Sequence, residues 1–291
     1  LTEEYMSRRF IAKEVNQHIQ EVWQSKLETL NEHNIIPTLA TVRVGAKSAD
    51  ISYEKGATKK MHQYNLGVEN IVLPDDVEED VLNKIKELSE NNNIHGILLM
   101  QPLPERFDER KVKSAIASVK DVDCTTVGNL GAVIAGWEDC YPYCAPAAVM
   151  ELLDYYKIEL KGKNVCIIGS GLVVGKPLSM LMSNALATVS LCNVFTKDVT
   201  EFSKKADIIV SACGVPGLVD EKYVSEGQIL IDVGTSFVDG KLRGDVDLGS
   251  VDEIVDAVTP TPGGISGITT TILAKHLISA AYKMYESGGL K

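Results

Sequence analysis

Residues 164–175 read NVCIIGSGLVVG, an apolar run that passes directly into a turn with three spaced glycines. The apolar run is typical of a buried strand, and the residues after the last glycine predict a helix. Glycines at such a turn let the backbone approach a pyrophosphate, while free amides at the start of the helix attract its charge. Gly169, Gly171 and Gly175 therefore predict a nucleotide site. Their spacing is one residue longer than the commonest dinucleotide fingerprint, so it leaves the identity of the nucleotide open.

The same alternation of strands and helices continues on both sides of this turn. Downstream, apolar runs at 188–193, 206–214 and 228–234 are separated by segments of helix length. Upstream, the predicted strands are 38–44, 70–74 and 95–100, and the predicted helices are 7–32, 57–65, 78–91 and 148–157. Strands that alternate with helices predict a parallel sheet with crossover helices. The expected fold class is α/β.

The length of 291 residues favours two domains, because single domains usually have about 100–200 residues. The stretch CYPYCAP, residues 140–146, marks the expected boundary. We expect an α/β domain over residues 1–143, joined by a C-terminal helix within residues 269–291. A doubly wound, Rossmann-like parallel-sheet domain is expected over residues 144–268.

Composition and charge argue against several classes of protein. The formal charge of −11 and the pI of about 5.0 are unlike those of a protein that binds nucleic acid through its phosphates. No apolar stretch has the roughly 18 residues of a membrane span, and the first residues lack the pattern of a secretory signal. The six cysteines have no CxxC spacing and the five histidines no paired spacing, so we expect reduced thiols, no metal site and a cytoplasmic protein.

Several separated segments resemble, in the same order, the bifunctional methylenetetrahydrofolate dehydrogenase/cyclohydrolase family. They are Pro102-Leu103-Pro104, Lys120-Asp121-Val122-Asp123, Val174-Gly175-Lys176-Pro177, Asp232-Val233-Gly234, Gly244-Asp245-Val246-Asp247, Thr259-Pro260-Thr261-Pro262-Gly263-Gly264 and Thr269-Thr270. The resemblance implies a first domain that binds the folate, a second domain that binds NAD or NADP, and a homodimer. It also implies two reactions, namely oxidation of 5,10-methylenetetrahydrofolate and hydrolysis of the methenyl product to 10-formyltetrahydrofolate.

The resemblance also implies a set of cofactor-binding residues. They are Gly169, Ser170, Gly171, Val174, Gly175, Lys176, Phe195, Thr196, Gly214 and Gly234. Ser170 replaces an arginine that is common in the family, and Val194-Phe195 replaces a Ser-Arg pair that contacts the 2′-phosphate of NADP. Two cations for that phosphate are therefore missing. We expect a weaker preference for NADP, with use of NAD.

Three residues of the first half are candidates for the folate chemistry that the resemblance implies. Asp123 could accept hydrogen bonds from the pterin ring, although its residue type also suits a loop cap. Lys59 stands eight residues before Gly67, as the family's lysine does, and a lysine of lowered pKa can serve the hydrolysis. Alternatively, Lys59 is an ordinary solvent-exposed lysine on a helix. Tyr53 resembles the partner tyrosine, which the family uses in catalysis and in substrate binding.

The spacing of Tyr53 and Lys59 departs from the family pattern. Six positions separate them, where the family has four, so on one regular helix their side chains would lie about 240° apart. A helix that begins near Gly56 would instead leave Tyr53 on a turn.

Two other substrate-binding segments also depart from the family pattern. Met100 stands where the family has glutamine, while Gln101 follows one place later and on the opposite face of a regular strand. Pro262, Gly263 and Gly264 keep the start of the family's closing loop, although its later proline is absent.

Three functions remain open at this point. The first is the bifunctional enzyme, and the second is a dehydrogenase that has lost the cyclohydrolase activity, which Met100 and the Tyr53–Lys59 spacing allow. The third is a catalytically silent protein on the same fold that binds folate or a nucleotide. Accumulation of the methenyl product would distinguish the second function from the first.

Overall fold

The computed structural model describes residues 6–289, which form two compact units. The three-stranded unit comprises residues 19–132 and 137–144 and the C-terminal residues from Thr270. The six-stranded unit comprises the described residues up to His18, together with residues 133–136 and 145–269. Each unit has its own parallel sheet.

The three-stranded unit is built on the strand order β3-β2-β4. Its strands are β2 (Thr38–Val44), β3 (Gly67–Leu73) and β4 (Gly96–Leu99), and both neighbours run parallel to β2. The crossover helices are α2 (Ser48–Gln63) and α3 (Glu78–Glu90). Because the strand order reverses beside β2, the carboxyl ends of β2 and β4 form the edge at which α/β sheets bind ligands.

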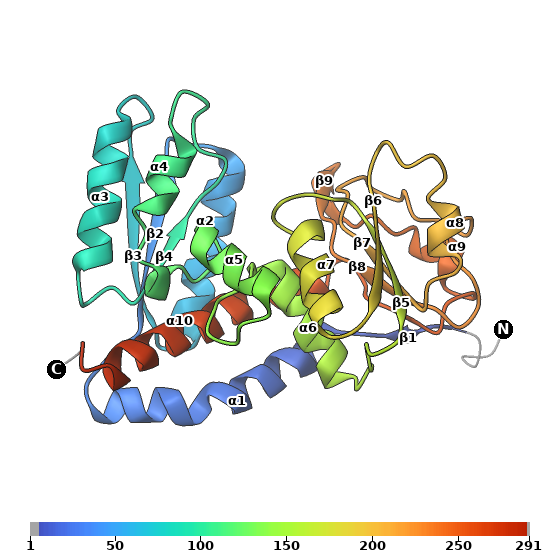
Figure 1. Cartoon of the computed structure of the whole chain (residues 1–291), viewed down its shortest axis with the longest axis horizontal. Coiled ribbons are helices and arrows are strands. Elements are labelled where there is room, and N and C mark those ends of the chain that lie inside the picture. The colour runs from blue at the N-terminus through green and yellow to red at the C-terminus, as the bar shows by residue number, and fades with distance from the viewer. Residues whose placement is uncertain (1–5, 290–291) are drawn as a thin grey trace. The chain divides into compact units, whose positions relative to one another are not determined.

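The two faces of β2 pack against different helices. Ala40 and Val42 lie in an apolar cluster with Val81 and Ile85 of α3. The alternate side chains of β2 point to the opposite face, where Arg43 pairs with α2. The helices α3 and α4 (Glu109–Ser114) are seen beside the strands in Figure 1.

Helix α2 begins nine residues earlier than the predicted helix over 57–65, so that predicted start is wrong. Glycine inside a helix costs about 1 kcal/mol, which made Gly56 look like a helix start. The buried positions Asp50, Glu54, Ala57 and Met61 recur at helical spacing on both sides of it. Packing of this continuous face therefore outweighs the local preference of one glycine.

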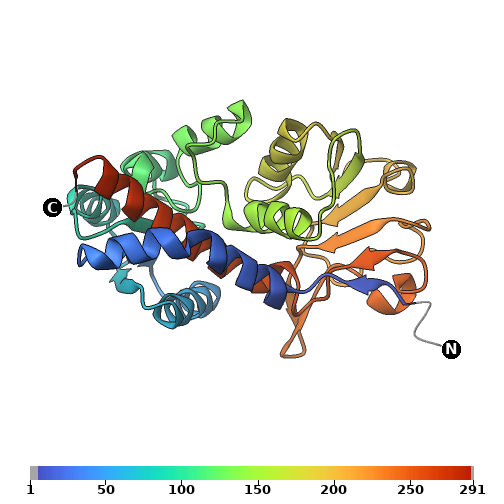
Figure 2. The same ribbon diagram turned by 90° about the horizontal axis from the view of Figure 1, so that it is seen from below.

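Helix α10 (Thr269–Glu286) matches the predicted C-terminal helix and lies beside α1 (Ala12–Glu32), as Figures 1 and 2 show. The Lys26 ammonium lies 5.5 Å from the ring centroid of Tyr282.

Helix α5 spans Val127–Ala135. The short 3-10 turn Ser118–Lys120 precedes it.

The six-stranded unit has the strand order β1-β11-β8-β7-β5-β6, and all neighbours are parallel. Its strands are β1 (Arg8–Arg9), β5 (Asn164–Ile168), β6 (Thr188–Cys192), β7 (Ile208–Ser211), β8 (Ile229–Asp232) and β11 (Ala257–Val258). The remaining elements are α6 (Cys144–Tyr155), α7 (Gly175–Asn184), α8 (Thr200–Ser203), α9 (Leu248–Val251), the 3-10 turn Ile265–Gly267 and the hairpin β9 (Ser236–Val238) with β10 (Lys241–Arg243). From β5 onward this is a doubly wound order, with its reversal between β5 and β7.

Strand β1 replaces the beginning of the helix predicted over 7–32, so the predicted start at Ser7 is wrong. Arg8 donates its backbone N–H to the carbonyl of Asp256 at 2.9 Å, and β1 pairs with β11. The Arg9 guanidinium contacts both carboxylate oxygens of Asp252, at 2.7 and 2.6 Å. These bonds lower the pKa of Asp252 to about 2 and fix an extended backbone.

Candidate functional site

The glycine turn lies at the reversal point of the six-stranded sheet, between the ends of β5 and β7. Gly169 has a φ of +113°, and a Cβ on it would lie 2.4 Å from the carbonyl oxygen of Ala212. A Cβ on Gly175 would lie 1.8 Å from the carbonyl oxygen of Gly169. Only glycine fits at either position, so the chain can pass tightly from β5 into α7.

The remaining residues of this turn leave room beside the start of α7. Nothing lies within 4 Å of a Cβ built on Gly171. Val174 is the N-cap residue of α7 and makes no side-chain capping bond, while Lys176 is exposed in the first turn. Ser170 is half-buried. The Lys176 N–H bonds the carbonyl of Gly171 at 3.0 Å, so the open glycine and the exposed lysine are the features that fit the pyrophosphate of a dinucleotide.

The loop after β6 presents apolar side chains at the position where dinucleotide-binding folds contact the ribose. Val194 and Phe195 are 92% and 91% exposed. Asn193 folds the loop, since its side chain accepts the Phe195 N–H and its own N–H bonds the Thr196 hydroxyl, both at 2.9 Å. Asp198 accepts bonds from the backbone N–H and the hydroxyl of Thr200, so its carboxylate is engaged in the turn before α8.

A pair of buried aspartates, whose contact no sequence pattern predicts, organises the next loop. Asp245 accepts hydrogen bonds from the Ser211 hydroxyl at 2.9 Å and from the N–H groups of Cys213 and Gly214 at 2.8 and 3.2 Å. Asp232 in turn accepts the Asp245 N–H at 3.1 Å, and burial raises the pKa of Asp232 to about 6. The family-like segments that contain both residues were a signal, but only the folded chain shows their contact.

This aspartate pair holds two of the predicted cofactor residues. Gly214 has a φ of +68° and is exposed, so its bond to Asp245 fixes an otherwise open turn. Gly234 is buried, and a Cβ on it would lie 2.1 Å from the carboxylate of Asp245. Both glycines therefore lie around one carboxylate at the carboxyl ends of β7 and β8.

The predicted closing loop follows β11 in the same unit. Pro262 and Gly263 are exposed, whereas Gly264 is buried and a Cβ on it would lie 2.7 Å from the carbonyl of Pro260. The carbonyl of Gly263 accepts the N–H of Ala12 at 2.8 Å. This bond connects the loop to the start of α1.

In the three-stranded unit, hydrogen bonds connect the segments that follow the carboxyl ends of β2 and β4. Lys47, just before α2, donates its ammonium to the carbonyl of Pro102 at 2.6 Å. Met100 is buried and extends the pairing of β4, since its N–H bonds the carbonyl of Val42 at 2.9 Å. Gln101 follows, half-buried, in the turn before Pro102.

The segment Lys120–Asp123 mixes structural residues with one candidate. The buried Lys120 ammonium donates to the carbonyls of Leu88 and Asn91 at 3.0 and 2.7 Å, which secures the end of α3. The buried Asp121 accepts the N–H groups of Thr125 and Thr126, together with the Thr126 hydroxyl and the Asn129 amide. Asp121 is therefore the loop cap, and Asp123 is left for another role.

Asp123 lies beside Tyr53 and Cys144. Its carboxylate accepts the Cys144 N–H at 3.0 Å, and burial raises its pKa to about 6. Burial, followed by the charges of Asp123 and Cys144, raises the pKa of the Tyr53 phenol well above its usual value. Tyr53 therefore stays protonated at neutral pH and can donate a hydrogen bond. Sequence reasoning missed Cys144, because its contact spans 21 residues and no spacing rule connects them.

Lys59 does not join this group. Tyr53 and Lys59 both lie within α2, and six helical positions turn their side chains about 240° apart. Lys59 lines a separate hollow of about 390 Å³ with Glu54, Thr58 and Asn70. The residue one turn after Tyr53 is the buried Ala57. The structure thus brings Asp123 to Tyr53 but places Lys59 on another side of the helix.

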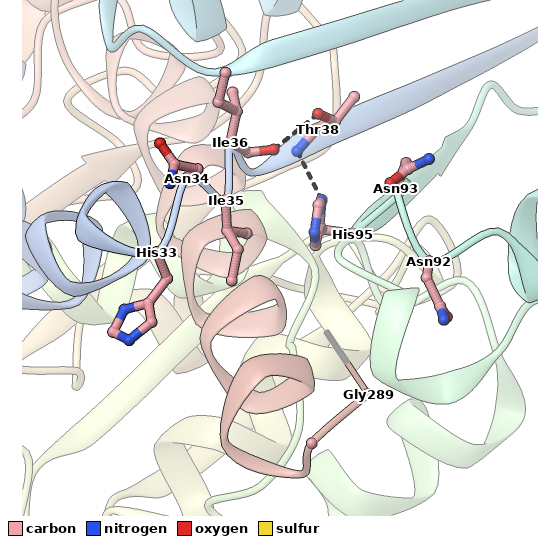
Figure 3. A pocket seen from close by; sticks show the side chains of 10 residues that line it. His33, Asn34, Ile35, Ile36, Thr38, Asn92, Asn93, His95 and Gly289 are labelled. Carbon is pink, nitrogen blue, oxygen red and sulfur yellow. Dashed lines mark hydrogen bonds between the residues drawn. The ribbon is translucent and has the colours of Figure 1, made fainter. Parts of the chain in front are cut away.

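Another hollow, of about 890 Å³, lies at the opposite, amino-terminal ends of β2 and β4 (Figure 3). His95 faces it and accepts the Thr38 N–H at 3.1 Å through Nδ1. Burial lowers the pKa of His95 to about 4, so this imidazole is neutral at physiological pH. Its hydrogen bond to Thr38 joins the amino-terminal ends of β2 and β4. None of the predicted site residues lines this hollow.

Within residues 6–289, no group of three or more histidine, cysteine, aspartate or glutamate side chains is placed to bind a metal ion. No helix of the described chain is both long and apolar enough to cross a bilayer.

Family models match both parts of the chain. The catalytic domain of tetrahydrofolate dehydrogenase/cyclohydrolase matches residues 10–123, and the NAD(P)-binding domain matches residues 143–285. The bifunctional protein FolD of Alkaliphilus metalliredigens is 42% identical over 270 residues, which cover 92% of this chain and 95% of that protein.

Solved structures agree with these matches. The bifunctional FolD of Campylobacter jejuni has a TM-score of 0.91 at 32% identity, covering 95% of this chain and 99% of that one. The Trypanosoma brucei dehydrogenase-cyclohydrolase, solved with NADP and an inhibitor, has a TM-score of 0.88 at 28% identity, covering 97% and 99%. With the glycine turn and the Asp123–Tyr53 group in place, the chain belongs to the tetrahydrofolate dehydrogenase/cyclohydrolase family.

Proposed function

We propose that this chain oxidises 5,10-methylenetetrahydrofolate with NAD+ or NADP+ and hydrolyses the methenyl product to 10-formyltetrahydrofolate. The observation that carries the proposal is the Asp123 carboxylate beside the protonated phenol of Tyr53, in the unit that matches the catalytic domain. The two full-length relatives that act on this folate support it.

Asp123 is proposed to hold the pterin ring. Above a pH of about 6 its carboxylate is ionised, and two oxygens then suit the paired N–H donors of a pterin. The Cys144 N–H already bonds one oxygen and fixes the plane of the group. Tyr53, which lies in α2, is proposed to contact the bound folate with its ring or through its hydroxyl. Met100 and Gln101 are proposed to border the same substrate, and Pro262, Gly263 and Gly264 to contribute from the closing loop.

Hydride removal from a carbon flanked by two nitrogens gives a stabilised cation and needs no general base. The bound nicotinamide supplies the hydride acceptor. The work of the protein is therefore to hold the two reactants in position. The glycine turn of Gly169, Gly171 and Gly175 is proposed to hold the pyrophosphate, with Ser170, Val174 and Lys176 at the start of α7. Phe195, Thr196, Gly214 and Gly234 are proposed to line the rest of the cofactor.

We propose that NAD+ serves at least as well as NADP+. The side chains of Val194 and Phe195 are almost fully exposed, and neither can neutralise a 2′-phosphate. The nearest cation along the loop is the exposed Lys197, which lacks the forked geometry with which arginine binds phosphate.

A second candidate is a dehydrogenase with weak cyclohydrolase activity. The position of Lys59 favours it, because this lysine lines a hollow away from Tyr53 and the buried Ala57 stands one turn after the tyrosine. Hydrolysis would then lack its proton-transfer group near the methenyl carbon.

One assay tests both candidates. Purified protein is given 5,10-methylenetetrahydrofolate with NAD+ or NADP+, and reduced cofactor and methenyl-folate are followed separately. Reduced cofactor with little methenyl-folate supports the bifunctional enzyme, and persistent methenyl-folate supports the second candidate. Absence of turnover with both cofactors contradicts the proposed function.

We further propose a cytoplasmic homodimer. All six cysteines are free thiols, in keeping with a reducing compartment. Light scattering during size-exclusion chromatography gives the mass directly, and a monomer would contradict the dimer.

A further inference from the structure

The backbone just before Asp123 is held by a side chain of the C-terminal helix. Nδ1 of His276, in α10, lies 2.9 Å from the carbonyl oxygen of Val122, although 154 positions separate the two residues. A carbonyl oxygen only accepts hydrogen bonds, so Nδ1 carries the proton and donates it. Both residues are buried, and the bond is therefore shielded from competing water.

His276 acts as an oriented donor rather than as a charge. Burial lowers its pKa to about 4, and the ammonium groups of Lys275 and Lys283 act in the same direction, so the imidazole is neutral at physiological pH. A neutral imidazole has a single N–H, which here belongs to the bond with Val122. The ring also lies 5.3 Å from the ring of Tyr141, centroid to centroid, and this contact limits its rotation.

Helix α10 and strand β4 enclose Val122 closely. A Cβ on Gly96, the first residue of β4, would lie 2.9 Å from the side chains of both Val122 and Leu277, the residue after His276. Only a residue without a side chain lets helix, strand and loop approach in this way. The backbone of Asp121 also pairs with Ile97 of β4. The segment that leads to Asp123 is thus fixed from two sides.

The bond to His276 determines how Asp123 leaves the backbone. The carbonyl of Val122 shares one peptide plane with the nitrogen and Cα of Asp123, so a donor that fixes this carbonyl also fixes that plane. The Cys144 thiol contacts the same carbonyl at 3.9 Å and is a weaker donor. The Cys144 N–H holds one carboxylate oxygen of Asp123, at 3.0 Å. Plane and carboxylate are therefore both set before a ligand arrives.

We propose that His276 is a positioning residue for folate binding, which aims the Asp123 carboxylate at the pterin ring through the Val122–Asp123 peptide plane. This inference rests on the proposed function, because that function assigns the pterin to Asp123. A carboxylate binds two parallel N–H donors well only in one orientation, so a rotated peptide plane weakens the contact without removing any atom that touches the folate.

The test is equilibrium binding of tetrahydrofolate to variants of the full chain, measured by titration calorimetry. The amide nitrogen of His276→Asn stands as many bonds from the backbone as Nδ1, so affinity is expected to stay within about threefold. The amide of His276→Gln matches Nε2 instead, and His276→Leu has no donor. Both are expected to bind tetrahydrofolate about tenfold more weakly, with NAD+ affinity unchanged.

The matched control is Met284→Ala, a buried residue two turns further along α10. It is expected to lower the thermal transition by loss of packing and to keep the affinity for tetrahydrofolate. An equal loss of affinity in this control overturns the proposal, because α10 would then act only through stability. Equal affinities in His276→Asn and His276→Gln also overturn it, even where His276→Leu does not fold.

The same titrations separate this inference from the proposed function. If the unmodified chain and all variants bind tetrahydrofolate equally, the role of His276 is wrong and the proposed function stands. If the unmodified chain binds no tetrahydrofolate, both are wrong.

Discussion

Tyr53 and Lys59 lie on one uninterrupted helix, six positions apart, and their side chains leave it about 240° apart. The charge of Asp123 acts on the phenol of Tyr53, whereas Lys59 lines a hollow with Glu54, Thr58 and Asn70. One helix thus places the tyrosine and the lysine on different sides.

This separation predicts a small effect of Lys59→Met on hydrolysis. A general acid–base group contributes about 10²–10⁴-fold to a rate, so a lysine remote from the reacting carbon should change it by less than about tenfold. The measurement is the rate at which methenyl-folate disappears, corrected for the uncatalysed rate. A loss of a hundredfold or more, with the thermal transition retained, would show that Lys59 acts at the reacting carbon.

The pKa of Asp123 predicts how folate binding depends on pH. Burial raises this pKa to about 6, so the carboxyl takes up a proton as the pH falls through that value and loses an acceptor for the pterin. We expect kcat/KM for the folate to fall roughly tenfold per pH unit below about 6. In Asp123→Asn this dependence should disappear, and kcat/KM should be low throughout. An unchanged profile in Asp123→Asn would remove the residue from the site.

The exposed loop after β6 predicts that cofactor preference can be shifted. Phe195→Arg places a guanidinium where the 2′-phosphate of NADP is expected, and a charge-assisted bond of that kind is worth about 1.5–3 kcal/mol, or roughly tenfold and more in KM. The KM for NADP+ should fall while that for NAD+ changes little. Phe195→Gln, which has length without charge, is the control. An equal fall in KM for both cofactors would show that the loop does not read the phosphate.

The glycine turn predicts opposite results for two similar substitutions. Gly175→Ala places a methyl group 1.8 Å from the carbonyl oxygen of Gly169, so the turn must open and both the thermal transition and cofactor affinity should fall. Gly171→Ala meets no atom within 4 Å, so its thermal transition should stay within a few degrees. Calorimetry with and without NAD+ makes the comparison. Equal transition temperatures would contradict the packing described for Gly175.

The fold was largely predictable where local patterns decide it. The strand at Thr38–Val44 was predicted with its observed limits, and the helix Thr269–Glu286 lies within its predicted range, because apolar periodicity and flanking residues agree there. Strand β1 was missed, since its two residues extend only through pairing with β11, about 250 positions away. The start of α2 was misplaced because a local penalty at Gly56 was given more weight than a buried face that only tertiary packing reveals.

The candidate site was predictable to a similar degree. Asp123 and the three glycines could be named because their segments resemble the family's. The contacts of Asp123 with Cys144 and of Asp232 with Asp245 could not be predicted from the sequence. Each contact joins segments that only the folded sheet brings together. Motif resemblance identifies residues, whereas the direction in which Lys59 points depends on the phase of a whole helix.

In the proposed reaction, hydride passes from the methylene carbon of the folate to the nicotinamide. The direct measurement uses 5,10-methylenetetrahydrofolate with both hydrogens of that carbon replaced by deuterium, together with NAD+, and determines the mass of the reduced cofactor. We expect reduced cofactor that carries one deuterium and a methenyl or formyl product that keeps the other. Reduced cofactor without deuterium, or no reduced cofactor with either NAD+ or NADP+, would contradict it.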